Sequence, residues 1–120
     1  MAKTICVIDD EPGIRAELGN WLKDYGYAVM TAASGSEALK KIRRKRPSLV
    51  ILDIIMPEID GLEVLHQLKS DPLTSSIPVI MLTAKMESST IIKAQGLQAA
   101  DYFMKPFENE EFIRSIRRYV

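Results

Sequence analysis

The sequence is poor in the residues that form disulfides and zinc centres. It contains one cysteine, Cys6, and one histidine, His66, among 120 residues. A single cysteine excludes an internal disulfide and fits a reducing compartment. One cysteine and one histidine also cannot supply the Cys/His sets that hold zinc. Cys6 lies in an apolar run, which predicts a buried structural thiol.

The sequence also lacks long hydrophobic runs and an excess of either charge. Its apolar runs are much shorter than the roughly 20 residues of a membrane span, and its N-terminus has no signal-peptide layout. Sixteen Lys and Arg balance sixteen Asp and Glu, so net charge indicates neither a nucleic acid nor a membrane partner. We therefore expect a cytoplasmic protein in which residues 1–120 form a single domain.

Short apolar segments alternate with segments of helical periodicity. After each short segment, apolar residues recur at spacings of three and four, as in Ile14, Leu18, Trp21 and Leu22. Because strands and helices alternate, the sequence predicts an α/β fold with a parallel sheet and helices on both faces. The predicted strands are Thr4–Ile8, Tyr27–Thr31, Leu49–Leu52, Val79–Leu82 and Ala100–Met104.

Several residues predict where the helices begin and end. Pro12 suits a first helical turn, and Gly26 and Gly96 suit helix ends. Ser34–Glu37 has the pattern of a capping box, and Asp60–Glu63 is a close variant. The last helix opens with acids and closes with arginines, which matches the helix dipole.

Polar side chains stand at or just after the carboxyl ends of four predicted strands. They are Asp9 and Asp10, Asp53, Thr83 and Lys105. Each has an ordinary structural explanation, such as a helix cap or a solvated lysine. Ligands of parallel α/β sheets bind at the carboxyl edge, however, and this edge would bring all four motifs together. We therefore expect one site.

The residue types of this site suit phosphoryl chemistry. Three carboxylates repel one another, and their hard oxygens favour Mg²⁺ or Mn²⁺. A lysine and a hydroxyl beside such a metal suit an incoming phosphoryl group. A carboxylate can accept that group as an acyl phosphate.

These motifs together resemble the receiver domain of bacterial two-component response regulators. The resemblance covers essentially the whole chain and implies a flavodoxin-like, doubly wound sheet of five parallel strands in the order 2-1-3-4-5. The matching segments are Asp9-Asp10-Glu11, Asp53 to Pro57, Asp60-Gly61, Met81 to Ala84, Asp101-Tyr102 and Lys105-Pro106-Phe107.

The resemblance assigns a metal and a phosphoacceptor. It implies that Asp53 accepts a phosphoryl group from a sensor histidine kinase or a histidine phosphotransfer protein. It implies that Asp9, Asp10, Asp53 and the backbone carbonyl of Ile55 bind Mg²⁺. The chain would then be a signalling switch, and an enzyme only for its own phosphorylation and dephosphorylation.

The resemblance also assigns the switch. Thr83 and Lys105 would contact the phosphoryl group, Thr83 and Tyr102 would change position, and the Lys105–Pro106 peptide would be cis. The surface of the fourth helix, fifth strand and fifth helix would change in response. Its candidate residues are Lys85, Ile91, Lys93, Gln95 and Met104.

Two positions depart from the family pattern. Gln98 stands where the family often has glycine, which affects the shape of that loop. Ile55, two residues after Asp53, can offer only its backbone to the metal and cannot orient a water molecule. We therefore expect the phosphoaspartate to hydrolyse slowly.

Two other functions fit the same residues. One is a pseudo-receiver that binds a partner without being phosphorylated, and the complete set of site residues argues against it. The other is a Mg²⁺-dependent phosphohydrolase with Asp53 as nucleophile, but Ile55 occupies the position of its usual acid/base carboxylate.

The remaining expectations concern partners. The basic run from Lys40 to Arg46 and the lone His66 are interpreted as solvated surface, so we expect no direct nucleic acid contact and no membrane contact. The domain would be a monomer or a phosphorylation-linked homodimer. It would either stand alone or belong to a longer regulator, with an effector that the sequence does not identify.

Overall fold

The computed structural model describes residues 2–84 and 87–120. Five strands alternate with five helices along this part of the chain. Their bounds are β1 Thr4–Ile8, α1 Pro12–Asp24, β2 Ala28–Ala32, α2 Gly35–Arg44, β3 Leu49–Leu52, α3 Gly61–Ser70, β4 Val79–Thr83, α4 Ser88–Gly96, β5 Asp101–Met104 and α5 Glu110–Tyr119. Lys85, one of the expected surface residues, lies outside the described residues.

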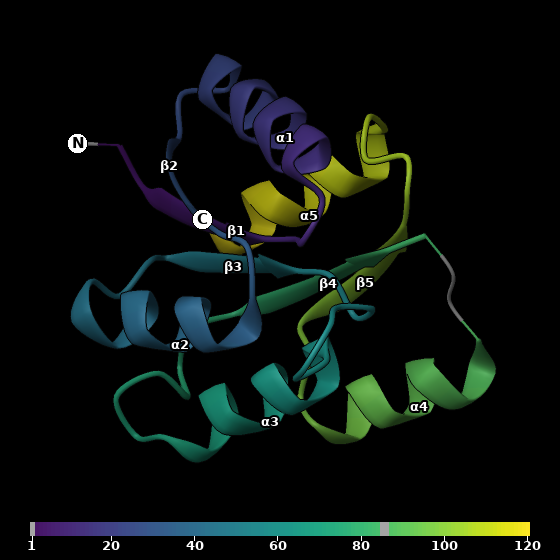
Figure 1. Cartoon of the computed structure of the whole chain (residues 1–120). Coiled ribbons are helices and arrows are strands. Elements are labelled where there is room, and N and C mark those ends of the chain that lie inside the picture. Colours follow the sequence, from purple (N-terminus) through teal and green to yellow (C-terminus); the bar gives the residue numbers. More distant parts are fainter. Residues whose placement is uncertain (1, 85–86) are drawn as a thin grey trace.

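The strands form one parallel sheet in the order β2-β1-β3-β4-β5. Figure 1 shows α1 and α5 on one face of the sheet and α2, α3 and α4 on the other. The predicted α/β class, the flavodoxin-like strand order and the covering of both faces are therefore confirmed. No helix among the described residues combines the length and apolar character that crossing a bilayer requires.

The central strands are continuously apolar because helices cover both of their faces. Every residue of β3 and β4 is buried. Alternate residues of each strand enter one of two apolar cores, one beneath α1 and α5 and the other beneath α2, α3 and α4. Cys6 is fully buried in the second core, and burial raises the pKa of its thiol to about 12.

The predicted capping residues begin their helices. Pro12 is the first residue of α1. The backbone N–H of Glu37 donates to Ser34 Oγ at 3.2 Å, and that of Glu63 donates to Asp60 Oδ1 at 3.0 Å. The strand predictions were correct to within one residue at each end. The sequence did not predict the cap of α5, where the Phe112 N–H donates to Asn109 Oδ1 at 2.7 Å.

A glycine takes the left-handed conformation after α1, but not after α4. Gly26 follows α1 with φ of 92°, as a glycine at a helix end often does. Gly96 is the last residue of α4, but the left-handed residue beyond that helix is Gln98, with φ of 69°. The chain therefore reverses after α4 through a residue that carries a side chain.

Candidate functional site

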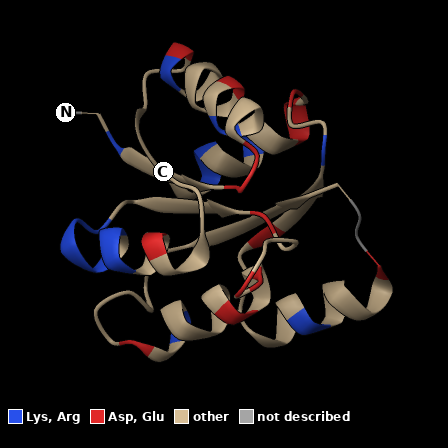
Figure 2. Ribbon diagram, in the orientation of Figure 1, with Lys and Arg blue, Asp and Glu red and all other residues tan. Residues whose placement is uncertain are grey.

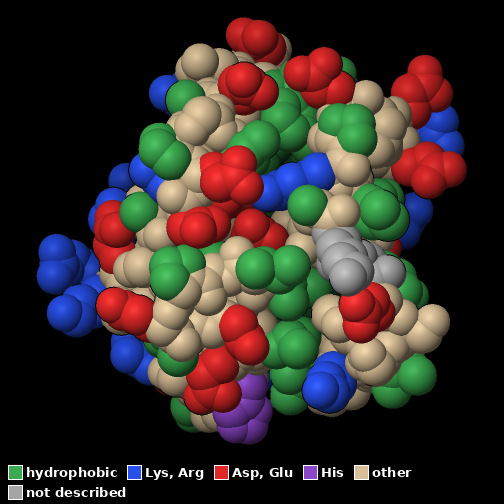
Figure 3. Space-filling view, turned by 45° about the vertical axis from the view of Figure 1, so that its right-hand side comes forward, with side chains coloured by type: hydrophobic (Ala, Val, Ile, Leu, Met, Phe, Trp, Pro, Cys, Tyr) green, Lys and Arg blue, Asp and Glu red, His purple; other side chains and the backbone are tan. Residues whose placement is uncertain are grey.

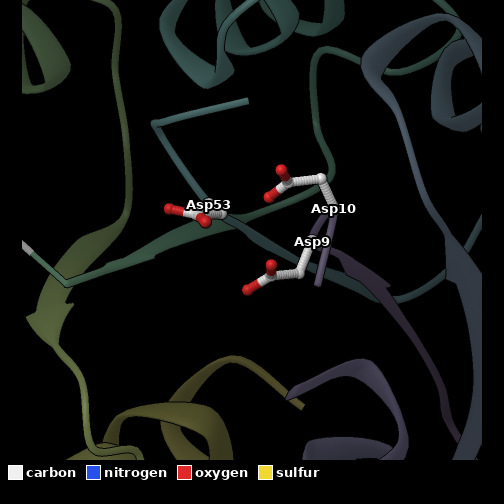
Figure 4. A group of neighbouring side chains, drawn as sticks. All are labelled: Asp9, Asp10 and Asp53. Atoms are coloured by element: carbon white, nitrogen blue, oxygen red, sulfur yellow. The ribbon is translucent and has the colours of Figure 1, made fainter. Parts of the chain in front are cut away.

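Three aspartates meet at the carboxyl edge of the sheet. Asp9 and Asp10 follow β1, and Asp53 follows the neighbouring strand β3. Figure 4 shows their carboxylates converging on one space. One oxygen from each lies within 4.8 Å of the other two. The sheet therefore brings together residues that are more than 40 positions apart in the sequence.

The loop after β3 holds Asp53 from two sides. Its N–H donates to the carbonyl of Ile8 at 3.0 Å, which continues the strand pairing by one residue. The N–H of Ile55 donates to Asp53 Oδ1 at 3.3 Å. The first residue of α3, Gly61, packs so close to the main chain at Asp53 that a Cβ atom there would clash with the Asp53 carbonyl oxygen. The nucleophile candidate is thus fixed before any ligand binds.

Asp9 is anchored, whereas Asp10 is open to solvent. The Asp9 N–H donates to the carbonyl of Ala32 at 3.2 Å, and Asp9 Oδ1 accepts from the Glu11 N–H at 3.0 Å. Arg15 Nη1 donates to the Asp9 carbonyl at 2.7 Å. The carboxylate of Asp10 is exposed and makes no hydrogen bond or ion pair within the described part of the chain. Asp10 therefore has free oxygens to offer a ligand.

Lys105 supplies the positive charge of the site from the end of β5. Its Nζ lies 2.8 Å from Asp9 Oδ2 and 3.4 Å from Asp53 Oδ2. The peptide that joins it to Pro106 is cis. Burial alone would lower the pKa of Lys105, but its hydrogen bond to Asp9 and the charges of Asp53 and Asp9 outweigh burial and raise that pKa. Lys105 therefore stays an ammonium.

The surroundings of Asp53 make its carboxyl group a weaker acid than a solvent-exposed aspartate. Burial and then the charge of Asp9 raise the pKa of the Asp53 carboxyl above its ordinary value, and Lys105 only partly opposes them. Three carboxylates against one ammonium leave the cluster with an excess of negative charge. A divalent cation would relieve this excess, and oxygen ligands are those that Mg²⁺ takes. The residues present therefore fit a magnesium ion.

Thr83, the last residue of β4, adds a hydroxyl to the same edge. It is completely buried, and its Oγ1 has no hydrogen-bond partner among the described residues. A buried hydroxyl without a partner is costly. The position thus suits a ligand oxygen that would accept a hydrogen bond from Thr83.

The side chains of two more expected residues make no hydrogen bond to the aspartates within the described residues. Ile55 points its side chain outward, with 60% of its surface exposed. Tyr102, on β5, is half-buried, and its hydroxyl accepts a hydrogen bond from Gln95 Nε2 of α4 at 3.0 Å. Sequence reasoning named Gln95 only as a surface residue and did not predict this pair, because the two residues belong to different elements.

The basic run and His66 lie away from the aspartates. Figure 2 shows basic residues gathered at the C-terminal end of α2, and Figure 3 shows acidic side chains with a basic one among them in the middle of the face that carries the site. Within the run, Lys41 pairs with Glu37 at 2.8 Å and Arg43 with Asp71 at 3.2 Å. His66 is exposed on α3.

Curated proteins are similar in sequence to most of this chain. It is 44% identical over 119 residues to the probable transcriptional regulator ycf27 of Porphyridium aerugineum, covering 97% of this chain and 48% of that protein. It is 43% identical over 111 residues to the alkaline phosphatase synthesis transcriptional regulatory protein PhoP of Bacillus subtilis, covering 92% and 45%. The chain thus spans about half the length of these curated relatives.

Solved structures agree with the fold. Chemotaxis protein CheY4 of Vibrio cholerae superposes with a TM-score of 0.93 at 28% identity, over the full length of both chains. Response regulator TrrA of Thermotoga maritima, solved in complex with Mg²⁺ and BeF, superposes with a TM-score of 0.89 at 36% identity, covering 98% of this chain and 99% of that one.

The family profile of the response regulator receiver domain matches residues 5–117. That range runs from β1 into the last turns of α5 and includes every residue of the aspartate cluster and its lysine. Sequence, strand order and structural neighbours agree on one assignment: the chain belongs to the response regulator receiver domain family.

Proposed function

We propose that this chain is a phosphorylation-dependent signalling switch whose phosphoacceptor is Asp53. One observation carries the proposal: the Asp53 carboxylate lies in a cluster with Asp9 and Asp10, with the Lys105 ammonium near one of its oxygens. A carboxylate that receives a phosphoryl group needs such surroundings, because the transferred group brings further negative charge into an acidic pocket.

In the proposed reaction, an oxygen of Asp53 attacks the phosphorus of a phosphohistidine on a sensor kinase or a phosphotransfer protein. A P–O bond to Asp53 forms as the P–N bond to the histidine breaks. The imidazole nitrogen keeps the electron pair of that bond and takes up a proton. The product is an acyl phosphate on Asp53.

The surrounding residues would receive the transferred group. The ammonium of Lys105 would neutralise part of its charge, and Thr83 Oγ1 would donate a hydrogen bond to one of its oxygens. Asp9 and Asp10, together with the phosphoacceptor and the carbonyl of Ile55, would hold Mg²⁺ or Mn²⁺. When bound, the metal supplies charge neutralisation to the phosphoryl oxygens.

Phosphorylation would then change the surface formed by α4, β5 and α5. The modification adds roughly −1.5 to −2 elementary charges, and Thr83 would move toward the new oxygens. Tyr102 would turn into the space that Thr83 leaves. Such a change shifts the population between two packings of the same fold, and a partner that binds one packing better would read it.

The output of the switch is proposed to be transcriptional. The relatives that are 43–44% identical carry names of transcriptional regulators, and this chain matches about half of each. DNA recognition would therefore belong to the part of such a regulator outside the match, and the receiver would act on it through its changed surface or through phosphorylation-linked pairing of two copies.

The proposal is tested by incubating the protein with Mg²⁺ and phosphoramidate and measuring its intact mass. We expect one phosphoryl adduct, which disappears in Asp53→Asn and persists in Asp71→Asn, a variant of the aspartate that follows the C-terminal end of α3. Absence of any adduct would support a pseudo-receiver, and multiple-turnover release of phosphate would support a phosphohydrolase. Either result would overturn the proposal.

A further inference from the structure

Apolar burial holds α4 to the sheet less firmly than it holds α3. α4 buries only one residue completely, Ala94, whereas α3, of similar length, buries four. Ile92 of α4 is 67% exposed. Elements with few buried apolar side chains are those that move at low cost. A polar contact between this helix and the sheet can therefore contribute a large share of what holds the helix in place.

One such contact joins α4 to the neighbouring strand. Gln95, in the last turn of α4, donates from Nε2 to the hydroxyl of Tyr102 on β5 at 3.0 Å. The Tyr102 ring packs against the core that lies beneath α2, α3 and α4. The hydrogen bond therefore fixes both the end of the helix and the direction of the Tyr102 side chain.

Tyr102 shares its face of the sheet with Thr83. Side chains alternate along a strand, and Met81, two residues before Thr83, lies in the core beneath α2, α3 and α4, against which Tyr102 also packs. Met81 is the register partner of Tyr102 in the β4–β5 pair. A movement of Thr83 toward the carboxyl edge would thus open space on the side of the sheet where Tyr102 lies.

We infer that Gln95 is a positioning residue, whose hydrogen bond to Tyr102 holds the tyrosine at the α4 surface and so sets the resting population of the switch. The inference rests on the proposed function, because the Gln95 hydrogen bond would oppose the movement of Thr83 and Tyr102 that phosphorylation is proposed to cause. Gln95 is exposed on α4, so a Tyr102 hydroxyl that turns inward must leave it. Breaking this bond is part of the cost of switching.

The test measures binding of beryllofluoride, a phosphoryl mimic, in the presence of Mg²⁺ by fluorine NMR. Removing a contact made only in the resting arrangement tightens any ligand that favours the other one. For one neutral hydrogen bond, we expect Gln95→Ala to lower the apparent Kd roughly two- to tenfold. Its affinity for Mg²⁺ alone should match that of the wild type, because the aspartates are unchanged.

Gln67→Ala is the matched control. Gln67 is a glutamine on α3 that donates to Glu63 Oε1 at 3.2 Å, and we expect its removal to leave the Kd unchanged. Tyr102→Phe removes only the hydroxyl, so adding Gln95→Ala to it should produce no further tightening. Urea unfolding of each variant verifies that the fold is retained.

The outcomes separate the two proposals. If wild type binds no beryllofluoride, or if Asp53→Asn binds it equally well, the proposed function fails and the role of Gln95 fails with it. If wild type binds at Asp53 but Gln95→Ala has the wild-type Kd, only the role of Gln95 is overturned. Tightening that persists in the Tyr102→Phe background would also overturn it.

Discussion

At the residue scale, Ile55 bears on the lifetime of the proposed phosphoaspartate, because it lies two residues beyond Asp53. Its side chain is 60% exposed, and in the proposed switch it would border the route by which water reaches the acyl phosphate on Asp53. An isoleucine can shield that route but cannot orient the water by a hydrogen bond. The proposed phosphoaspartate should therefore be long-lived.

Ile55→Asn tests this role. A side-chain amide can position the attacking water, and one hydrogen bond of about 1 kcal/mol corresponds to roughly fivefold faster hydrolysis. The measurement is the decay of phosphorylated protein after removal of the donor, followed by intact mass. Ile55→Val, which keeps an apolar side chain, serves as control. An unchanged half-life in Ile55→Asn would contradict the role.

Also at the residue scale, the crowding of carboxylates makes Asp53 a source of instability without metal. Burial and Asp9 raise the pKa of Asp53 above the ordinary 3.8, so the folded protein binds this proton more tightly than the unfolded chain does. Stability therefore falls as pH rises from below 3.8 through the folded-state pKa, and the cost is constant above it. Ionised Asp53 thus lowers the stability of the metal-free fold.

Asp53→Asn should accordingly stabilise the metal-free protein at pH 7, by an amount on the order of 1 kcal/mol. The gain should shrink as pH is lowered, because protonation removes the charge from wild type too. Lys105 keeps its closer partner, Asp9, in the variant. Urea unfolding at several pH values provides the measurement, with Glu17→Gln on the exposed middle of α1 as control. A variant less stable than wild type at pH 7 would refute the argument.

At the scale of elements, the chain reverses after α4 at a cost. Gln98 has φ of 69°, and a left-handed residue with a side chain costs about 1 kcal/mol relative to glycine. Gly96, two residues earlier, has ordinary helical geometry and open space where a Cβ would stand. The glycine thus occupies the position that does not need it.

Two substitutions should therefore each stabilise the protein. Gln98→Gly should gain about 1 kcal/mol by relieving the left-handed residue, and Gly96→Ala should gain about 0.5 kcal/mol by restricting the unfolded chain. Thermal unfolding measures both. The reverse pattern is expected at Gly26, where φ is 92°, so Gly26→Ala should destabilise. Loss of stability in Gln98→Gly would show that its side chain contributes more than its backbone costs.

The sequence predicted the elements and their local signals, but not the contacts that depend on how the elements pack. Strands and their polar ends were predictable because Asp9, Asp53 and Lys105 interrupt or end apolar runs. The carboxyl ends of the strands in a parallel sheet lie at the same edge, which brings these residues together. Local caps such as Ser34 followed from spacing alone. The pairing of Gln95 with Tyr102 was not predictable, because it depends on how α4 sits on the sheet.

At the scale of the whole molecule, the fold places three mutually repelling carboxylates at one edge of its sheet. Asp9 and Asp53 are almost completely buried, and Asp10 is exposed beside them. The ammonium of Lys105 neutralises only part of their negative charge. The sheet order β2-β1-β3-β4-β5 forces these groups together, and the two apolar cores must supply the stability that the cluster removes. A ligand that neutralises the cluster should thus stabilise the entire domain.

Mg²⁺ is that ligand in our proposal. A ligand that binds only the folded state at 100 times its Kd adds about 2.7 kcal/mol to the free energy of unfolding, so we expect a gain of this size in urea titrations with saturating Mg²⁺. The exposed side chain of Asp10 makes no hydrogen bond or ion pair within the described residues, so Asp10→Asn should be at least as stable as wild type without metal and should lose the gain. K⁺ at equal ionic strength controls for screening. If Mg²⁺ stabilised Asp10→Asn as much as wild type, the gain would not depend on the Asp10 carboxylate. The Mg²⁺ site proposed at the three aspartates would then be wrong.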